Sequence, residues 1–200
     1  LEGQTRCISP TELAVCNDNQ WVLGGQCDGA CAQGVCQSFA CAQAAAEKSY
    51  LGCEYVTLEL PNLTTYSQPI PTAVVLTNPS EVESAQIQIL GPNGQSSPLV
   101  AEQTISVPDI ADLPPIYTDQ TVRSEIRDAA DQVVQNMVMR ADQISIPPGG
   151  TGTFLLPAAR WPEAGSLVKL IAHRVISDIP IGAYQFSPYC CNFSFSNDAS

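Results

Sequence analysis

The chain has 200 residues, of which 44% are hydrophobic and 14% charged, enough apolar side chains for the core of one ordinary domain. Acidic residues outnumber basic ones 20 to 8, which gives a net charge of −12. The basic residues are scattered along the chain. Nucleic acids and anionic membrane surfaces are therefore poor partners, because both need clustered Lys and Arg, and we expect no nucleic-acid partner. The sequence also lacks an apolar run of about 18 residues, so we expect no membrane span.

The opening segment, residues 1–47, is rich in cysteine. Six of the nine cysteines fall in it, namely Cys7, Cys16, Cys27, Cys31, Cys36 and Cys41, and the other three are Cys53, Cys190 and Cys191. Such density is typical of oxidising compartments, where disulfides replace a core that a short segment cannot build. We therefore predict a secreted protein in which these cysteines form disulfides. Because nine is an odd number, at least one thiol is free or bonds outside the chain, and a partner preceding Leu1 would resolve the parity.

A metal site is the competing interpretation of the cysteines. Paired CxxC motifs are absent, and the only histidine, His173, is distant from the cysteine-rich segment. Disulfides are therefore favoured, and we expect no metal ion and no cofactor.

Local patterns predict the elements in chain order. Residues 15–27 (VCNDNQWVLGGQC) are typical of a hairpin that turns at residues 17–19, and the Ala-rich residues 39–50 favour one or two helical turns. From Cys53 onward the pattern is that of β-strands. Residues 54–60 alternate, with Val56, Leu58 and Leu60 on one face and Tyr55, Thr57 and Glu59 on the other.

Further strands follow with the same alternation. Ala85, Ile87 and Ile89 are expected to point inward, and the GPNG sequence after them supplies a hairpin turn. Two long apolar strands, 166–177 and 181–186, flank the sequence Asp-Ile-Pro. About nine or ten strands with few helices predict an all-β chain, in which residues 48–200 form an antiparallel β-sandwich behind the disulfide-rich module.

One segment, residues 121–140, fits two structures. Its apolar side chains fit a helical stripe, comprising Val122, Ile126, Ala129, Val133 and Met137. The same residues also suit two strands around a turn at DAADQ. We prefer the hairpin, because the neighbouring segments are β.

Several stretches together resemble one known family. They are SYLGCEY, VVLTNPS, ISIPPGG, AHRVISDIPIGAYQF and CCNFSFSNDAS, spread over residues 49–200. This part of the chain resembles the IgGFc-binding protein N-terminal domain family, in its bacterial branch. The resemblance implies an extracellular or surface-exposed binding or adhesive module within a larger protein, with no catalytic residue set. It also implies a further strand after SNDAS, so we expect the domain to be incomplete here.

The adjacent Cys190 and Cys191 allow three interpretations. Each can bridge to a different partner, which would tie the last strand to Cys53 and to the opening module. They can bond to each other in a strained ring, or one of them can cross-link to a second chain. We prefer the first interpretation, because ordinary bridge geometry carries little strain.

No catalytic residue set can be assembled from the sequence. His173 and Ser177 share a face of one strand but lie about 13 Å apart at roughly 3.3 Å per residue, whereas a nucleophile and its base need about 3 Å. We therefore expect His173 to be a partly buried strand residue and the chain not to be an enzyme. Two sets of loop residues carry the oxygen atoms that calcium needs, but no calcium-binding motif is present and solvated groups are the better explanation: Asp109, Asp112 and Asp119, and Asn17, Asp18 and Asn19.

The aromatic residues near the end of the sequence divide into core residues and a candidate interaction surface. Tyr184 and Phe186 share one side of a strand and are expected in the core, whereas Phe193 and Phe195 form a candidate interaction surface that the expected further strand would cover. We predict a non-enzymatic extracellular or cell-surface module that binds a protein or glycan ligand. The alternative is a structural subunit of an extracellular fibre, joined to copies of itself by strand edges or intermolecular disulfides.

Overall fold

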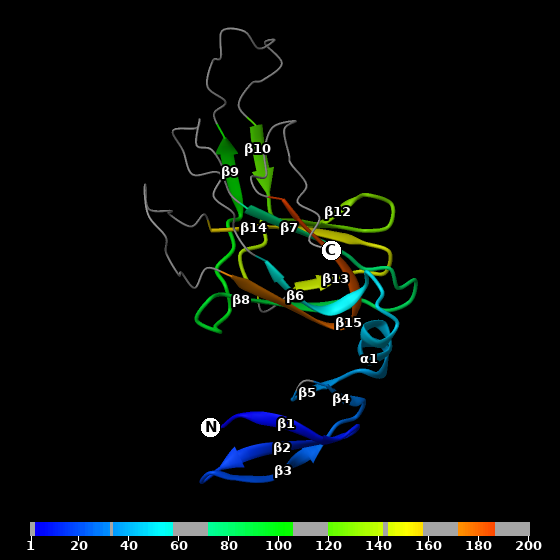
Figure 1. The fold of residues 1–200 in the computed structure, drawn as a ribbon. Helices are drawn as coiled ribbons and strands as arrows, with labels where there is room; N and C mark the ends of the chain where they lie inside the picture. Colours follow the sequence, from blue (N-terminus) through cyan, green and yellow to red (C-terminus); the bar gives the residue numbers. More distant parts are fainter. Residues whose placement is uncertain are drawn as a thin grey trace. The chain divides into compact units, whose positions relative to one another are not determined.

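The structure, a computed structural model, describes residues 3–32, 34–57, 72–105, 120–141, 144–157 and 172–186. The chain divides into two compact units (Figure 1). The first comprises Leu1–Cys53 and Asp178–Pro180, and the second comprises Glu54–Ser177 and Ile181–Ser200. We expected the boundary after residue 47, and the units divide after Cys53.

The first unit contains a three-stranded antiparallel sheet with β2 in the middle. Its strands are β1 (Thr5–Ser9), β2 (Glu12–Asn17) and β3 (Gln20–Gln26). The predicted hairpin at residues 15–27 is confirmed. Asp18 and Asn19 form its two-residue turn with φ of 49° and 59°, a conformation that Asp and Asn tolerate better than other side chains.

A smaller hairpin and the helix complete this unit. The hairpin consists of β4 (Ala30–Ala32) and β5 (Val35–Gln37), and the helix is α1 (Phe39–Ala46). The helix confirms the prediction from the Ala-rich sequence. Ser38 is its N-cap, because the Ser38 hydroxyl accepts the Cys41 amide hydrogen at 3.2 Å.

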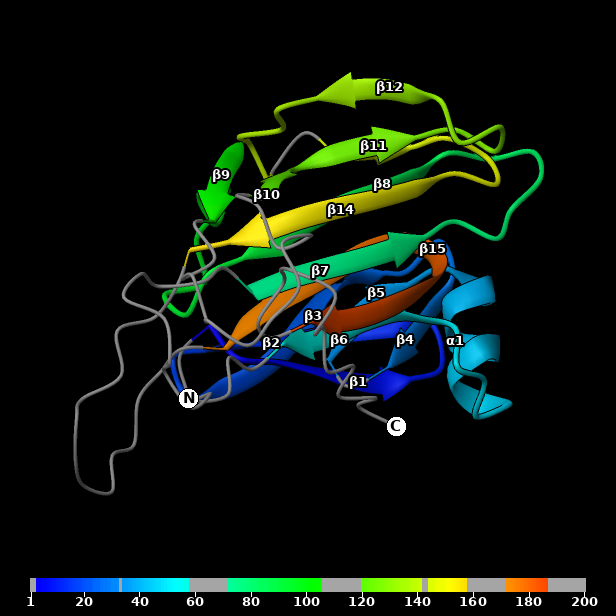
Figure 2. The ribbon, with the colours of Figure 1, turned by 90° about the horizontal axis from the view of Figure 1, so that it is seen from above.

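The second unit is built on an eight-stranded sheet, with the order β12-β11-β14-β7-β15-β8-β13 and with β6 paired to β15. Its strands are β6 (Gly52–Thr57), β7 (Thr72–Thr77), β8 (Ala85–Leu90), β11 (Glu125–Arg127), β12 (Val133–Asn136), β13 (Ile144–Ile146), β14 (Thr151–Leu156) and β15 (His173–Phe186). A separate pair consists of β9 (Glu102–Ile105) and β10 (Gln120–Arg123). Figure 2 shows β12, β11, β14 and β7 side by side. The all-β expectation is confirmed, while a sandwich stays a prediction.

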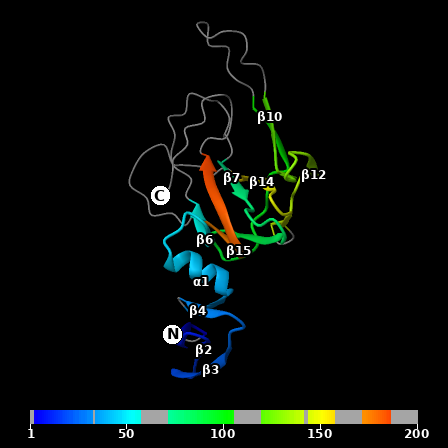
Figure 3. The same cartoon turned by 90° about the vertical axis from the view of Figure 1, so that its right-hand side faces the viewer.

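Strand β15 differs from the expectation of two strands separated by a break. It is one strand of 14 residues that includes Pro180. The strand can be followed in Figure 3. Its first half pairs with β8 from Arg174 to Ser177, and its second half pairs with β7 from Gly182 to Phe186. Pro180 lacks an amide hydrogen, but it lies between these two ladders, so it interrupts neither the pairing with β8 nor the pairing with β7.

The core of the second unit follows the alternation of its strands. Ala85, Ile87 and Ile89 of β8 are at most 3% exposed, as predicted. On β6 the polar side chain faces inward and the apolar one faces outward, since Thr57 is buried while Val56 is 66% exposed. Leu58 and Leu60, which were expected to share the face of Val56, lie outside the described residues.

The expectation that Tyr184 is a core residue is wrong. Its side chain is 49% exposed, because the register of β15 places it opposite the half-buried Val75. The fully buried Leu76 of the same neighbour lies opposite Ala183. Cross-strand partners share a face of the sheet, so the small Ala183 takes the inner position and Tyr184 the outer one. Phe186 is half-buried.

The segment 121–140 forms the preferred hairpin and not a helix. Strands β11 and β12 pair in antiparallel orientation around a turn that begins at Asp128. The Asp128 carboxylate accepts amide hydrogens from Ala130 and Gln132, both at 2.9 Å. The register shifts by one residue, so that Val134 is a bulge on β12.

Two segments quoted for the family resemblance meet around Asn78, whose side chain is 2% exposed. Its amide nitrogen donates to the carbonyl oxygens of Ile146 and Pro147, both at 3.1 Å, and to that of Glu83 at 2.8 Å. Its side-chain oxygen accepts the Ser80 amide hydrogen at 3.0 Å. Asn78 therefore holds the end of β7 against the end of β13.

Candidate functional site

Three disulfides are present, and they link Cys7 to Cys31, Cys27 to Cys36, and Cys41 to Cys53. All six sulfur atoms belong to the first unit. The preferred link between Cys53 and the pair at Cys190 and Cys191 is wrong, because Cys53 is bonded to Cys41. In the folded chain the Cα atoms of Cys41 in α1 and Cys53 in β6 lie 5.6 Å apart, a distance that a disulfide spans, and a separation of 12 residues makes the loop less costly to close than one that reaches Cys190. Cys190 and Cys191 themselves lie outside the described residues.

Cys16 was predicted to form a disulfide, and it does not form one with any described cysteine. Within the described part of the chain it is a free thiol, and its side chain is 1% exposed. It lies on the central strand β2, opposite Trp21 of β3, and the guanidinium of Arg6 stacks 4.3 Å from the Trp21 ring. A folded chain therefore offers no access to the Cys16 sulfur.

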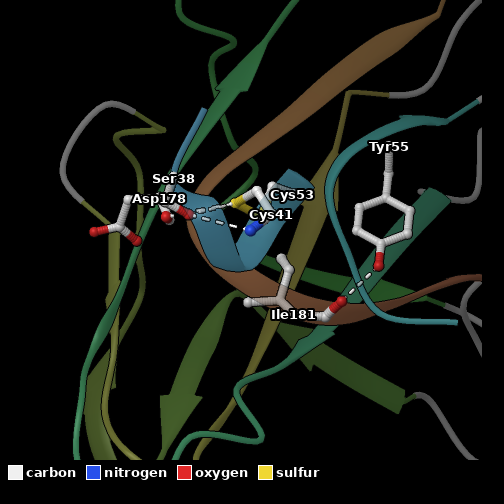
Figure 4. Close-up of a disulfide and its surroundings, with 6 residues drawn as sticks. All are labelled: Ser38, Cys41, Cys53, Tyr55, Asp178 and Ile181. Atoms are coloured by element: carbon white, nitrogen blue, oxygen red, sulfur yellow. Dashed lines mark hydrogen bonds between the residues drawn. A yellow bond between two sulfur atoms is a disulfide. The ribbon is translucent and has the colours of Figure 1, made fainter. Parts of the chain in front are cut away.

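The Cys41–Cys53 disulfide has the most developed surroundings of the three (Figure 4). Cys41 lies in the first turn of α1 and is 4% exposed, whereas Cys53 lies in β6 and is half-buried. The Ser38 hydroxyl donates to the Cys41 sulfur at 3.0 Å while it accepts the Cys41 amide hydrogen. The Asp178 carbonyl oxygen lies 3.6 Å from the same sulfur. Cys41 is thus flanked by one donor and one acceptor.

Two contacts in the second unit fix β6 beside β15. The Tyr55 hydroxyl donates to the Ile181 carbonyl oxygen (Figure 4). The Arg174 guanidinium forms two hydrogen bonds with the Glu54 carboxylate, at 2.6 and 2.8 Å. These bonds to Glu54, opposed by partial burial and supported by the opposite charge, raise the pKa of Arg174 above its ordinary value. Both contacts attach to the strand that carries Cys53.

His173 and Ser177, which the sequence places too far apart for a nucleophile and its base, lie on β15. His173 is half-buried, and burial lowers the pKa of its imidazole. Ser177 is 6% exposed, and its hydroxyl has no hydrogen-bond partner among the residues that the structure describes. The two residues are four positions apart on one extended strand, as expected. Asp178 is exposed.

The residues considered as calcium ligands lie in two different parts of the chain, only one of which the structure describes. Asn17, Asp18 and Asn19 form the exposed end of the β2–β3 hairpin. Asp109, Asp112 and Asp119 lie outside the described residues, as do Phe193 and Phe195. Across the described ranges, no three side chains of His, Cys, Asp or Glu are grouped so that they could hold a metal ion.

A surface that the sequence did not indicate lies at the edge of the eight-stranded sheet. Residues 133–139, here called the edge segment, comprise β12 and the three residues after it. Val133, Val134, Met137 and Met139 are between 44% and 64% exposed. The two methionines flank Val138, which is buried at 3%. The signal available in the sequence was the apolar run VVQNMVM, but its exposure depends on the place of β12 in the sheet.

Within the ranges that the structure describes, no helix has the length and apolar character needed to cross a membrane. Comparison of the chain with protein-family models, with curated proteins and with solved structures finds no match.

Proposed function

We propose that the chain is a non-enzymatic binding module of the cell exterior, which recognises a protein or glycan ligand. The three disulfides support the location, because such bonds persist in oxidising compartments and are rare in the cytosol. A small unit whose buried side chains are mostly Ala and Cys gains much of its stability from these bonds.

The edge segment is the observation that carries the binding role. Four apolar side chains are exposed within seven consecutive residues, and none of the seven is charged. Three charges of the same hairpin are paired with each other, since Arg127 contacts Glu125 at 2.7 Å and Asp131 at 3.3 Å, and the Asp128 carboxylate accepts amide hydrogens in the turn. An apolar patch without free charge gains energy when a ligand covers it, because its water is released.

The bulge at Val134 favours contact through side chains over strand addition. A regular edge strand can pair with a strand of a partner along its whole backbone, whereas a bulge interrupts that pairing. With only four residues, β12 offers few backbone bonds. The valine and methionine side chains are therefore the main contact groups, and methionine adapts well to varied ligand surfaces.

The family resemblance makes the Fc fragment of immunoglobulin G the first protein ligand to test. A mucin, as a heavily glycosylated protein, serves as the probe for a glycan ligand. Both are immobilised, and the oxidised chain is passed over them in a surface plasmon resonance measurement. Val134→Lys places a charge in the edge segment. Val82→Lys is the matched control, because Val82 is an 84% exposed valine outside that segment.

We expect Val134→Lys to weaken binding by about ten-fold or more, since a desolvated charge in an apolar contact costs more than 1.4 kcal/mol. Val82→Lys should bind as the wild-type chain does. The proposal is contradicted if the wild-type chain binds neither surface, or if the two lysine variants bind equally.

The second candidate function is a subunit of an extracellular assembly. The position of β12 at the edge of the sheet supports it, while the 1% exposure of Cys16 argues against a cross-link through that thiol. Light scattering across a range of protein concentrations distinguishes the two functions. Concentration-dependent growth that Val134→Lys abolishes would favour the assembly, and a constant monomer mass would favour the binding module.

A further inference from the structure

We propose that the Cys41–Cys53 disulfide is a site of thiol–disulfide exchange with a fixed direction. An external thiol attacks Cys53, and Cys41 is the leaving group. The inference is independent of the proposed binding function, because it concerns the first unit and uses none of the edge segment.

The two cysteines of this disulfide differ in how open they are to an external thiol. Exchange requires a thiolate to approach one sulfur along the line of the S–S bond. Cys41 is 4% exposed within the first turn of α1, so its sulfur is closed to such an approach. Cys53 is half-buried, so of the two residues it is the one more open to an external thiol.

The groups around Cys41 favour this sulfur as the one that leaves. A leaving sulfur departs as a thiolate, which is stabilised by hydrogen-bond donors and by the positive end of a helix. The Ser38 hydroxyl already donates to the Cys41 sulfur at 3.0 Å, at the N-terminus of α1. No group in the described part of the chain is found to donate in this way to the Cys53 sulfur. The electron pair of the broken bond is therefore better stabilised on Cys41.

The Asp178 carbonyl oxygen supplies an independent third observation. A sulfur in a disulfide has no hydrogen to donate, yet this acceptor lies 3.6 Å from the Cys41 sulfur. Once Cys41 is a free thiol, its S–H can donate to that oxygen. Cys41 thus has a donor for its thiolate form and an acceptor for its thiol form (Figure 4).

The chemical step is balanced without a further oxidant. The external thiolate forms a new bond to the Cys53 sulfur, the Cys41–Cys53 bond breaks, and its electron pair stays on Cys41. The Cys41 thiolate then takes a proton from water. One disulfide is exchanged for another, and the external thiol becomes attached to β6 through Cys53.

The Cys41–Cys53 disulfide differs from the other two disulfides in the groups around its buried sulfur, and not only in the exposure of its two cysteines. In Cys27–Cys36, Cys27 is also buried and Cys36 is exposed, so access alone directs attack to Cys36. In Cys7–Cys31, the Gly34 amide donates to the Cys7 sulfur at 3.3 Å. Only at Cys41, among these six described sulfur atoms, is a side-chain hydroxyl seen to donate, and a side chain can be exchanged by mutation.

The experiment uses the full oxidised chain and glutathione as the external thiol. The reaction is stopped with acid, free thiols are alkylated, and peptides are mapped by mass spectrometry. We expect glutathione on Cys53 and the alkyl group on Cys41 in the wild-type chain. Glutathione found on Cys41, or spread equally over both, would overturn the proposal without any variant.

Two variants of Ser38 test the role of its hydroxyl. Ser38→Thr keeps the hydroxyl, whereas Ser38→Asp keeps an N-cap acceptor for the Cys41 amide but places a negative charge beside the departing thiolate. We expect exchange at this bridge to slow by about ten-fold in Ser38→Asp and by less than about three-fold in Ser38→Thr. Equal rates in the two variants would refute the assignment of Cys41 as the leaving group. Circular dichroism and the exchange rate of Cys7–Cys31 control for damage to the fold.

Discussion

Replacement of Asn78 by alanine tests how much the junction of β7 and β13 contributes to stability. The side chain is 2% exposed and makes four hydrogen-bond contacts: the two hydrogens of its amide nitrogen are shared among three carbonyl oxygens, and its oxygen accepts one amide hydrogen. Alanine removes all four and leaves the Ile146 carbonyl, within the core, without this donor. Water can replace the bonds to Ser80 and Glu83, which lie nearer the surface.

The magnitude follows from these four bonds. A hydrogen bond contributes about 1 kcal/mol net, and a buried group left without a partner costs about 1–3 kcal/mol. Two bonds replaced by water lose little, whereas the two to Ile146 and Pro147 lose most of their value. We therefore expect Asn78→Ala to lower the free energy of unfolding by about 3 kcal/mol. Asn78→Asp should lower it further at neutral pH, because a carboxylate would face three carbonyl oxygens.

The assay is urea unfolding of the oxidised chain, followed by far-UV circular dichroism, with hydrogen exchange of β7 as a local measure. Asn93→Ala is the control, since Asn93 is an exposed asparagine that bonds only to the neighbouring Gln95 in the described part of the turn. It should cost less than about 1 kcal/mol. If Asn78→Ala changes the free energy of unfolding no more than Asn93→Ala does, the reasoning about this junction is refuted. At low pH the difference between Asn78→Asp and Asn78→Ala should shrink as the carboxylate is protonated.

Three more predictions follow from buried groups. Ser124→Ala should lower the free energy of unfolding by about 2 kcal/mol in the same urea assay, because the fully buried hydroxyl donates to the Val100 carbonyl and accepts the Leu155 amide hydrogen; no change would contradict it. Burial lowers the pKa of His173, so the unfolded chain binds a proton more readily than the folded chain does, and the free energy of unfolding should fall from pH 7 to pH 5. His173→Gln should flatten the free energy of unfolding over this pH range, and an unaltered pH dependence would exclude His173 as the cause. Cys16 should resist alkylation in the native chain and react fully in urea, as read by peptide mapping; rapid native labelling, or no labelling in urea, would show that it is not a buried free thiol.

Local chemistry made part of the fold predictable. The alternation of Ala85, Ile87 and Ile89 gave the inward face of β8, because side chains on a strand have a period of two. The turn at Asp18 and Asn19 was predictable for a similar reason, since few side chains accept a positive φ. Both features depend on residues that are neighbours in the sequence.

Features that depend on partners in space could not be predicted. Pro180 indicates a break, and only the change of neighbours along β15 explains why the strand continues. The outward position of Tyr184 is set by its register with β7. Six opening cysteines allow many pairings, and the bond from Cys41 to Cys53 required the relative positions of α1 and β6. The exposure of the edge segment likewise follows from strand order, which a single sequence does not encode locally.

The double pairing of β15 makes the spacing of its residues a property of the whole sheet. Val175 and Ile181, both fully buried, stand an even number of positions apart, on opposite sides of the change of neighbours. Loss of one residue between them would make that number odd, and the inward and outward sides would be interchanged in one half of the strand relative to the other. Insertions and deletions at residues 178–180 should therefore be tolerated in pairs and rejected singly, whatever the chemistry of the residue removed.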